Sequence, residues 1–270
     1  MPPQYVPILM YHSISNTANP RFRRYAVPPQ VFGEQLEYLK RHRYTAMTLR
    51  RLVQTMADTE PRLPPRPVVL TFDDAYSDFY SDAVPLLQRA GFTATLFVPT
   101  SFLGGSSKWL RRENEQARAI LSAEQLIQIC RAGIECGAHG HTHSGLDTLP
   151  AQVVWDEITI SKHVLEECLG KEIATMAYPF GYVTPAVAKM VRAAGYEAAC
   201  AVGYRPTALH DNPFVLPRLM ITPDLTPPHF GRLISAAWTI RTLVDRGRSA
   251  IWRRARRNPL SGLRARPMGV

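Results

Sequence analysis

The chain has 270 residues, of which 46% are apolar and 20% are charged, and its formal net charge is +10. This length and apolar fraction suffice to bury a sizeable core and exclude a disordered chain. Residues 230–270 contain ten Arg and a single acidic residue, Asp245, so this segment carries +9 and the remainder is close to neutral. The main domain therefore needs no anionic partner to explain the charge.

The cysteines and the N-terminal sequence indicate the cellular compartment of the protein. Four cysteines occur, at 130, 136, 168 and 200, and none forms a C-x-x-C pair. Their spacing demands no disulfide, so we expect buried thiols in a reducing environment. The N-terminus has no basic region followed by an apolar stretch of signal-peptide length, and we find no apolar run of 18 residues. If Met1 is the natural start, the sequence predicts a cytoplasmic protein.

Short β-type runs alternate with helical patterns along the chain. In chain order we expect a strand at 6–11, a helix at 29–42, a strand at 68–72, a helix at 81–90, a strand at 93–98, a helix at 123–132, a strand at 134–138, a helix at 151–169, a strand at 173–178, a helix at 185–194, and strands at 197–201 and 215–221. Residues 25–66 are rich in Pro and Arg and are interpreted as a rigid connector over the surface. Residues 102–118 are expected to form an excursion between a strand and the next helix.

About seven strands, most of them followed by a helix, favour a parallel α/β architecture. Polar groups follow several strands: His12, the pair Asp73 and Asp74, the histidines of 139–143, and the segment 179–181. In a parallel barrel active sites assemble at this end of the strands, and an open doubly wound sheet would place them at one edge. The glycine-rich nucleotide-binding motifs are absent from the sequence, which argues against a nucleotide-binding sheet.

The segment G-A-H-G-H-T-H-S-G at 137–145 places His139, His141 and His143 at alternate positions after a strand. Two imidazoles and a carboxylate form a common ligand set for a catalytic divalent metal that keeps an open position for water. Asp73 and Asp74 supply the carboxylate and leave one acid free to serve as a base. The alternative is a solvated loop with incidental histidines.

Three motifs occur in a fixed order: T-F-D-D at 71–74, G-x-H-x-x-x-H at 137–143 and A-Y-P-F-G at 177–181. Together they resemble the first three motifs of the polysaccharide deacetylases, the NodB-homology or carbohydrate esterase family four. The segment P-I-L-M-Y-H-S-I at 7–14 resembles the branch that contains the biofilm poly-N-acetylglucosamine deacetylases. The resemblance covers about residues 5–225. It implies a distorted (β/α)7-type, NodB-like barrel and metal-dependent hydrolysis of N-acetyl groups on an amino sugar.

The resemblance also implies roles for individual residues. Asp73 matches the catalytic base, and the backbone N–H of Phe180 matches the group that stabilises the oxyanion of the tetrahedral intermediate. The metal ligands that it implies are Asp74, His139 and His143. The metal is expected to be Zn, with Ni, Co or Fe as alternatives. His141 stands at a position that varies in the family and is left out of the ligand set.

Two departures from the family pattern affect the expected site. Many members have an Arg where this chain has Ala177, and the late L-x-H motif, whose His serves as general acid, is absent. His12 is the candidate to replace this acid, and the alternative is a histidine in a turn. Arg218 is the candidate to replace the missing Arg by pairing with Asp73, and the alternative is a surface ion pair.

The C-terminal segment from 226 to 270 is predicted to be a basic amphipathic helical tail, with 258–270 disordered, after a catalytic domain at 1–225. Apolar residues recur every three or four positions from Leu233, Trp238 and Trp252 flank them, and the other faces are rich in Arg. This pattern indicates peripheral contact of Leu233–Arg257 with an anionic membrane. The alternative is a helix packed on the barrel. No nucleic-acid motif is present, and no nucleic-acid partner is expected.

The function predicted from these patterns is a metal-dependent N-deacetylase that acts on a polysaccharide or a lipid-linked glycan. A second hypothesis keeps the mechanism but changes the substrate to a non-sugar amide or a formyl group. A third hypothesis, a catalytically silent carbohydrate-binding module, is motivated by the missing Arg and the missing late His. Retention of both Asp and both His residues argues against this third hypothesis.

Overall fold

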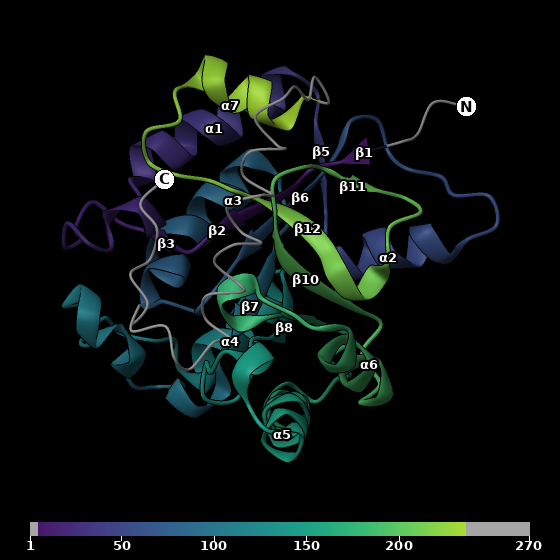
Figure 1. Cartoon of the computed structure of the whole chain (residues 1–270). Helices are drawn as coiled ribbons and strands as arrows, with labels where there is room; N and C mark the ends of the chain where they lie inside the picture. Colours follow the sequence, from purple (N-terminus) through teal and green to yellow (C-terminus); the bar gives the residue numbers. More distant parts are fainter. Residues whose placement is uncertain (1–4, 236–270) are drawn as a thin grey trace, which may run out of the picture. The chain divides into compact units, whose positions relative to one another are not determined.

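A closed barrel of parallel strands forms the centre of the part of the chain that the computed structural model describes, residues 5–235 (Figure 1). Its main sheet has the order β2-β12-β10-β9-β8-β7-β6-β5, and β6 also pairs with β2. Seven strands therefore close into a ring, while β5 lies outside it along the first half of β6. The strands of this sheet are β2 (Ile8–Tyr11), β5 (Thr45–Met47), β6 (Pro67–Phe72), β7 (Thr95–Val98), β8 (Glu135–Ala138), β9 (Thr175–Ala177), β10 (Ala198–Gly203) and β12 (Leu216–Met220).

Two small pairings lie beside the barrel. β1 (Tyr5–Val6) pairs antiparallel with β11 (Thr207–Ala208), and β3 (Ser13–Ile14) pairs parallel with β4 (Ala26–Val27). The second pair continues directly from β2 and fixes the segment that follows this strand. It therefore positions residues next to the carboxyl ends of the barrel strands.

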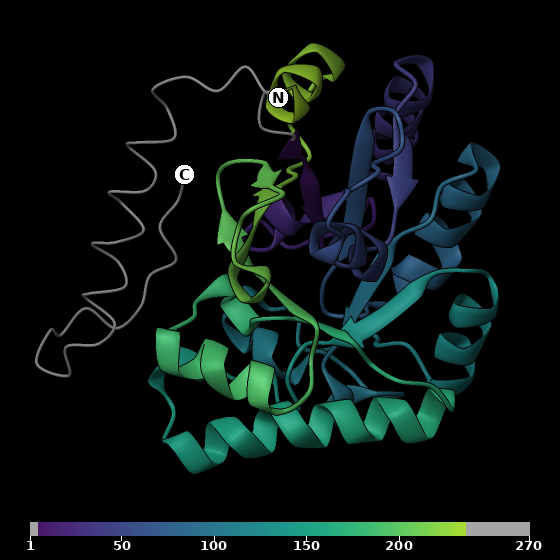
Figure 2. The same ribbon diagram turned by 90° about the vertical axis from the view of Figure 1, so that its right-hand side faces the viewer.

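Helices surround the barrel, and the long helix α5 runs along one side of it (Figure 2). They are α1 (Pro29–Arg41), α2 (Leu49–Ala57), α3 (Val84–Ala90), α4 (Ala123–Arg131), α5 (Ala151–Leu169), α6 (Pro185–Ala193) and α7 (Pro227–Ile234). α1 packs against α3 and α7, and α5 packs against α4 and α6. Ser122, the N-cap of α4, forms a capping box with Gln125, and Gly170 ends α5 in the left-handed conformation.

The predicted (β/α)7-type barrel is confirmed, since the ring is closed and all of its neighbouring strands are parallel. Each predicted strand and helix is present with its ends shifted by a few residues, apart from the first strand, which Pro7 divides into β1 and β2. The excursion predicted at 102–118 also exists, as short 3-10 turns, η3 (Thr100–Phe102) and η4 (Lys108–Glu113), between β7 and α4.

The interpretation of residues 25–66 as a surface connector is wrong. β5 and α2 lie in this segment, and Leu49 and Leu52 are fully buried against the first residues of the barrel strands, such as Ile8 and Val69. Burial of each Leu side chain stabilises the fold by roughly 2 kcal/mol. The helix α2 therefore closes the core at the amino ends of the strands. The richness in Pro and Arg concealed the helical spacing of the apolar residues of α2, and 58–66 is the longest irregular stretch of the segment.

The start of the predicted tail forms the helix α7, which packs on the barrel domain. Phe230 is fully buried with its ring edge-on to Tyr38 of α1, and a Cβ at Gly231 would lie 2.1 Å from the Tyr38 hydroxyl. The rest of the predicted tail, residues 236–270, lies outside the described residues. Within 5–235 no helix is both long and apolar enough to span a membrane.

Candidate metal centre

Four barrel strands deliver the predicted site residues to one end of the barrel. Asp73 and Asp74 follow β6. His139 follows β8, which is separated from β6 in the ring by β7 alone. Arg218 lies in β12, and His12 follows β2, the strand between β12 and β6. Because the strands are parallel, their carboxyl ends meet at one end of the barrel and bring these distant residues together.

Asp74, His139 and His143 form the one group of three potential metal ligands found within residues 5–235. One ligand atom from each residue lies within 4.8 Å of the other two, and all three side chains are buried. The Asp74 Oδ1 atom lies 3.0 Å from His143 Nε2 and 3.5 Å from His139 Nε2. The three side chains predicted as metal ligands are thus brought together at one end of the barrel.

The unpaired atoms of this group fit a divalent cation. Asp74 Oδ1 is buried and has no hydrogen-bond partner among the described residues. His139 Nδ1 lies 2.8 Å from the carbonyl oxygen of Ala177, which can only accept, so Nδ1 carries the proton and Nε2 keeps its lone pair. Burial lowers the pKa of His139 to about 4, which keeps this ring neutral near pH 7. A carboxylate oxygen and a neutral imidazole are suitable ligands for Zn, Ni, Co or Fe.

Asp73 and Arg218 form a bidentate ion pair inside the barrel. The guanidinium donates to the two carboxylate oxygens at 2.6 and 2.7 Å, and it also donates to the Thr71 hydroxyl at 3.2 Å. The Arg218 side chain is fully buried, which excludes the surface ion pair that was the alternative. Burial alone would raise the pKa of Asp73, but the charge of Arg218 lowers it below its ordinary value and keeps this acid ionised.

Unusual backbone conformations cluster at this end of the barrel. Asp74, Ala75, His143 and Phe180 all have positive φ, between 54° and 75°. Non-glycine residues rarely adopt this region, and such strain persists where the surrounding structure enforces it. Next to Phe180, Gly181 has φ of 73°, and a Cβ there would lie 2.0 Å from the Val202 side chain. The turn that carries Phe180 therefore requires glycine at 181.

The other predicted residues lie at different places around the ligand group. The His12 ring contacts the Tyr25 ring edge-on at 5.0 Å, and its Nδ1 is buried without a hydrogen-bond partner in the described part of the chain. Burial lowers the pKa of His12, against the opposing charges of Asp73 and Asp74. The ring of Phe180 is half exposed and lies 4.8 Å from that of His143.

His141 faces away from the ligand group. Its Nδ1 lies 2.9 Å from the Thr100 hydroxyl, and its backbone N–H donates to Glu157. It is not one of the three clustered ligands within 5–235. Its omission from the ligand set agrees with this geometry.

Sequence reasoning missed two side chains that support the ligands. The Tyr76 hydroxyl donates to Asp74 Oδ2 at 2.7 Å. Glu157 of α5 accepts hydrogen bonds from the backbone N–H groups of His141 and Thr142 and from the Thr142 hydroxyl. The sequence did contain a signal for Glu157, since this acidic residue lies on the apolar face of α5, next to Ile158. Tyr76 gave none, since its contact depends on the left-handed turn before it.

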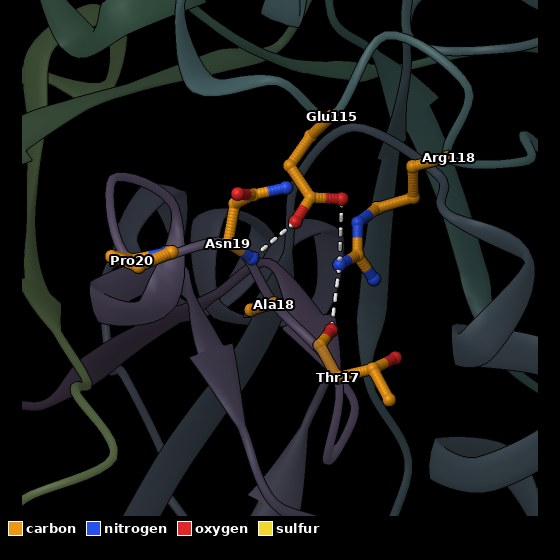
Figure 3. Close-up of a pocket in the computed structure, with 6 residues that line it drawn as sticks. All are labelled: Thr17, Ala18, Asn19, Pro20, Glu115 and Arg118. Carbon is orange, nitrogen blue, oxygen red and sulfur yellow. Dashed lines mark hydrogen bonds and ion pairs between the residues drawn. The ribbon is translucent and has the colours of Figure 1, made fainter.

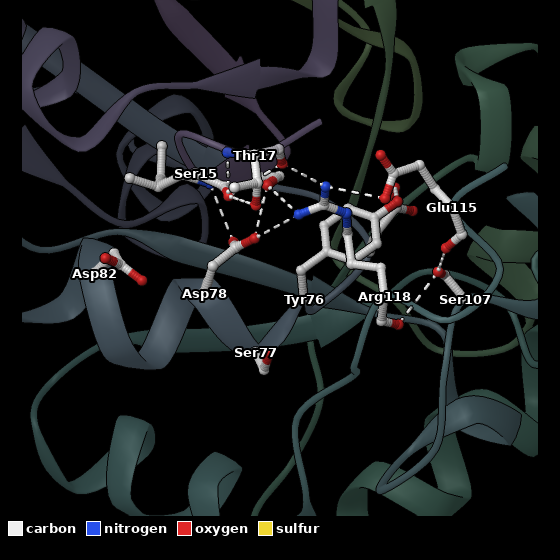
Figure 4. A network of polar contacts seen from close by, with 12 residues as sticks. Ser15, Thr17, Tyr76, Ser77, Asp78, Asp82, Ser107, Glu115 and Arg118 are labelled. Atoms are coloured by element: carbon white, nitrogen blue, oxygen red, sulfur yellow. Dashed lines mark hydrogen bonds and ion pairs between the residues drawn. The ribbon is translucent and has the colours of Figure 1, made fainter. Parts of the chain in front are cut away.

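A polar network connects the excursion at 102–118 with the segment after β3 (Figure 4). Arg118 donates to Asp78, to the Ser13 hydroxyl and to the Thr17 carbonyl, and it pairs with Glu115. The Arg118 guanidinium lies 5.7 Å from the ring of Tyr76, the residue that binds Asp74. The network therefore links the segment after β3 to the neighbourhood of Tyr76.

The same network borders a surface cleft of about 350 Å³ (Figure 3). Glu115 spans it, accepting from the backbone N–H of Asn19 while pairing with Arg118. In η4 of the same excursion, Trp109 packs its ring 4.7 Å from that of His143. The predicted excursion thus supplies both a cleft and an aromatic wall.

A closed parallel barrel in which a carboxylate and two imidazoles converge at the carboxyl ends of the strands is suited to a metal-dependent hydrolase. The family model for polysaccharide deacetylase matches residues 60–199. The chain belongs to the polysaccharide deacetylase family and is a hydrolase of that class, as the motifs predicted. The family depends on a divalent metal, and Asp74, His139 and His143 are residues that fit one.

Individual relatives agree with this assignment. The chain is 26% identical over 234 residues to YxkH of Bacillus subtilis, whose name assigns it to the same family, covering 87% of this chain and 77% of that protein. It is 23% identical over 217 residues to the poly-β-1,6-N-acetyl-D-glucosamine N-deacetylase of Staphylococcus aureus, covering 77% and 72%.

Solved structures of the same fold include the Streptococcus pyogenes deacetylase PplD in complex with acetate. It has a TM-score of 0.74 and 25% identity, and the match covers 86% of this chain and 99% of that one. IcaB from Ammonifex degensii has a TM-score of 0.70 and 22% identity, covering 86% and 97%, which is evidence for the fold alone.

We predict that Arg218→Met lowers the free energy of unfolding by about 3–5 kcal/mol, because it leaves the buried Asp73 carboxylate without a counter-charge. The double variant Asp73→Asn/Arg218→Met removes both charges and should recover most of this loss. Urea denaturation of the metal-free proteins measures both values. Equal stability of Arg218→Met and the wild type would contradict the role assigned to this ion pair.

We predict that Glu157→Ala weakens metal binding on the order of 10- to 100-fold, by analogy with other groups that orient metal ligands. Loss of the carboxylate leaves the His141 and Thr142 N–H groups without their acceptor and loosens the loop that carries His143. Glu157→Gln keeps one carbonyl acceptor and should lose less. Competition with a chelator measures the affinity, and wild-type affinity of the folded Glu157→Ala protein would refute the bracing role.

Proposed function

We propose that this chain removes N-acetyl groups from an N-acetylated amino sugar in a glycan, with Asp74, His139 and His143 as the metal ligands. The single observation that carries the proposal is the convergence of these three buried side chains on one point beside the ionised Asp73. A carboxylate that is not part of the ligand group is then free for proton transfer. An acetate-release assay on N-acetylated oligosaccharides, with and without chelator, tests the proposal.

The proposed roles follow from position and charge. When bound, the metal supplies Lewis acidity that polarises the acetyl carbonyl and lowers the pKa of water. Asp73, kept ionised by Arg218, accepts a proton from the attacking water. The backbone N–H of Phe180 donates to the oxyanion that develops on the carbonyl oxygen. His12 donates a proton to the departing amine of the sugar.

The proposed substrate class is a β-linked N-acetylglucosamine polymer or a lipid-linked glycan with the same amino sugar. The Staphylococcus aureus relative named above is an N-deacetylase of poly-β-1,6-N-acetyl-D-glucosamine, and it supports the first of these. Half-exposed Phe180 and the ring of Trp109, both against His143, offer apolar surfaces for a sugar ring or for an acetyl methyl group. Comparing rates on the two kinds of glycan separates them.

The other hypotheses make different predictions for the same assay. A deacylase of a non-sugar amide or formyl group would release acid from small amides but no acetate from any N-acetylated glycan. A silent carbohydrate-binding module would bind glycan without acetate release. The complete Asp-Asp-His-His set and the ion pair at Asp73 support an active enzyme.

We predict that Asp74→Ala, His139→Ala and His143→Ala each abolish both bound metal and acetate release, because each removes one of three ligands. His141→Ala is the matched control and should keep its metal, since its ring faces Thr100. Elemental analysis of the purified proteins measures the metal content. Wild-type metal content in any of the first three variants would remove that residue from the ligand set.

We predict that His12→Ala lowers kcat by roughly 10²- to 10⁴-fold, the usual contribution of a general acid, while the metal content stays unchanged. The amine leaves poorly unless it is protonated as the tetrahedral intermediate collapses. Steady-state kinetics and elemental analysis on the same protein give both quantities. Turnover close to that of the wild type would assign His12 to a structural turn.

We also propose peripheral membrane contact through Leu233–Arg257, with the cytoplasmic location predicted from the sequence as part of this proposal. Residues 237–270 contain nine Arg and one acid, and each Arg near an anionic surface contributes about 1 kcal/mol. The full chain should bind anionic vesicles in a salt-sensitive way, and a chain ending at Ala236, which keeps α7, should not. Sedimentation with vesicles measures this, and equal binding by both chains would remove the membrane role.

A further inference from the structure

Two thiols meet at the end of β8 opposite the metal ligands. Cys130, in the last turn of α4, and Cys136, in β8, have their sulfur atoms 3.2 Å apart. A disulfide bond is about 2.05 Å long, so closing it requires the two sulfur atoms to approach by roughly 1.2 Å. The turn between them contains Gly133 at φ of 83°, which places α4 directly against the start of β8.

A surface cleft of about 270 Å³ gives access to this pair. Both cysteines line it, together with Lys171 and Arg50. Cys130 is partly exposed, whereas Cys136 is buried. The expectation that all the cysteines are buried is therefore wrong for Cys130 and for Cys168, which is also partly exposed. A reagent that enters the cleft therefore reaches Cys130 before it reaches the buried Cys136.

The charges in the cleft favour a thiolate on the exposed member of the pair. The Cys136 thiol, 3.2 Å away, and the Lys171 ammonium in the same cleft lower the pKa of Cys130 below that of an ordinary thiol. The neighbouring Cys130 and burial raise the pKa of Cys136. Arg50 is engaged by Glu172 and Glu197, which leaves Lys171 as the cation that acts on the sulfur.

We propose that Cys130 and Cys136 form a thiol–disulfide exchange site that reacts with low-molecular-weight disulfides entering this cleft. In the first step the Cys130 thiolate attacks one sulfur of the reagent, the reagent's S–S bond breaks, and one thiolate leaves and takes a proton from water. In the second step Cys136 loses its proton to water and attacks Cys130 Sγ, and the second thiolate leaves. The dithiol gives two electrons, and one small disulfide becomes two thiols.

The test uses the reduced full-length protein and glutathione disulfide as the probe, followed by tryptic digestion under non-reducing conditions and mass spectrometry. Arg131 lies between the two cysteines, so trypsin separates their peptides unless a disulfide joins them. The wild type should yield the joined peptides and two glutathione molecules per chain. Cys136→Ser should stop after the first step, with glutathione attached to Cys130.

The remaining cysteines supply matched controls. Cys168, partly exposed on α5, and Cys200, buried in β10, should stay unmodified in the wild type. Cys130 should react with iodoacetamide at pH 7 on the order of 10-fold faster than Cys168, as expected for a thiolate. The proposal is overturned if Cys136→Ser acquires no glutathione on Cys130, or if Cys168→Ser rather than Cys136→Ser traps the mixed disulfide.

Discussion

Two adjacent buried carboxylates impose the constraint on which the site depends. Asp73 and Asp74 are both ionised in a nearly dry environment, and each needs an opposite charge or hydrogen-bond donors to be stable there. The left-handed turn at Asp74 divides them: Asp73 faces Arg218, and Asp74 faces the imidazoles and Tyr76. Apart from Tyr76, these partners lie far from Asp73 and Asp74 in the chain, so the order of strands in the ring decides whether this end of the barrel can form.

Local sequence patterns predicted most of the helices and strands of the fold. α5 was predicted with its observed ends, because Pro150 and Gly170 limit a long amphipathic run. The spacing of the histidines indicated a ligand group, since two imidazoles four residues apart converge when the loop between them turns. Gly140 lies in this turn with φ of 72°, a conformation that glycine adopts easily. A Cβ at this position would lie 3.1 Å from Glu157 Oε2, so a larger residue would crowd the carboxylate that binds the loop.

Other features depend on contacts between distant residues and left no local signal. The burial of Arg218 follows from its place in the strand that pairs with β2, and an isolated reading of L-P-R-L-M gives no reason to prefer an internal ion pair to a surface one. The helix α2 was not predicted for a similar reason. Its apolar face is short, and its role in the core is visible only in the fold, where it covers the amino ends of the strands. Arg118 likewise acquires meaning through Asp78 and Tyr76.

The pairing of β2 with β12 has a consequence for how the protein is made. Leu9 and Leu219 are neighbours in the ring, although almost the whole domain separates them along the chain. During synthesis β2 and β6 emerge early, and Asp73 has no counter-charge until Arg218 leaves the ribosome. Until then β2 and β10 present open strand edges that can pair with other chains. The nascent protein is thus most prone to aggregate just before its last barrel strand is complete, and this interval is where a chaperone is most useful to it.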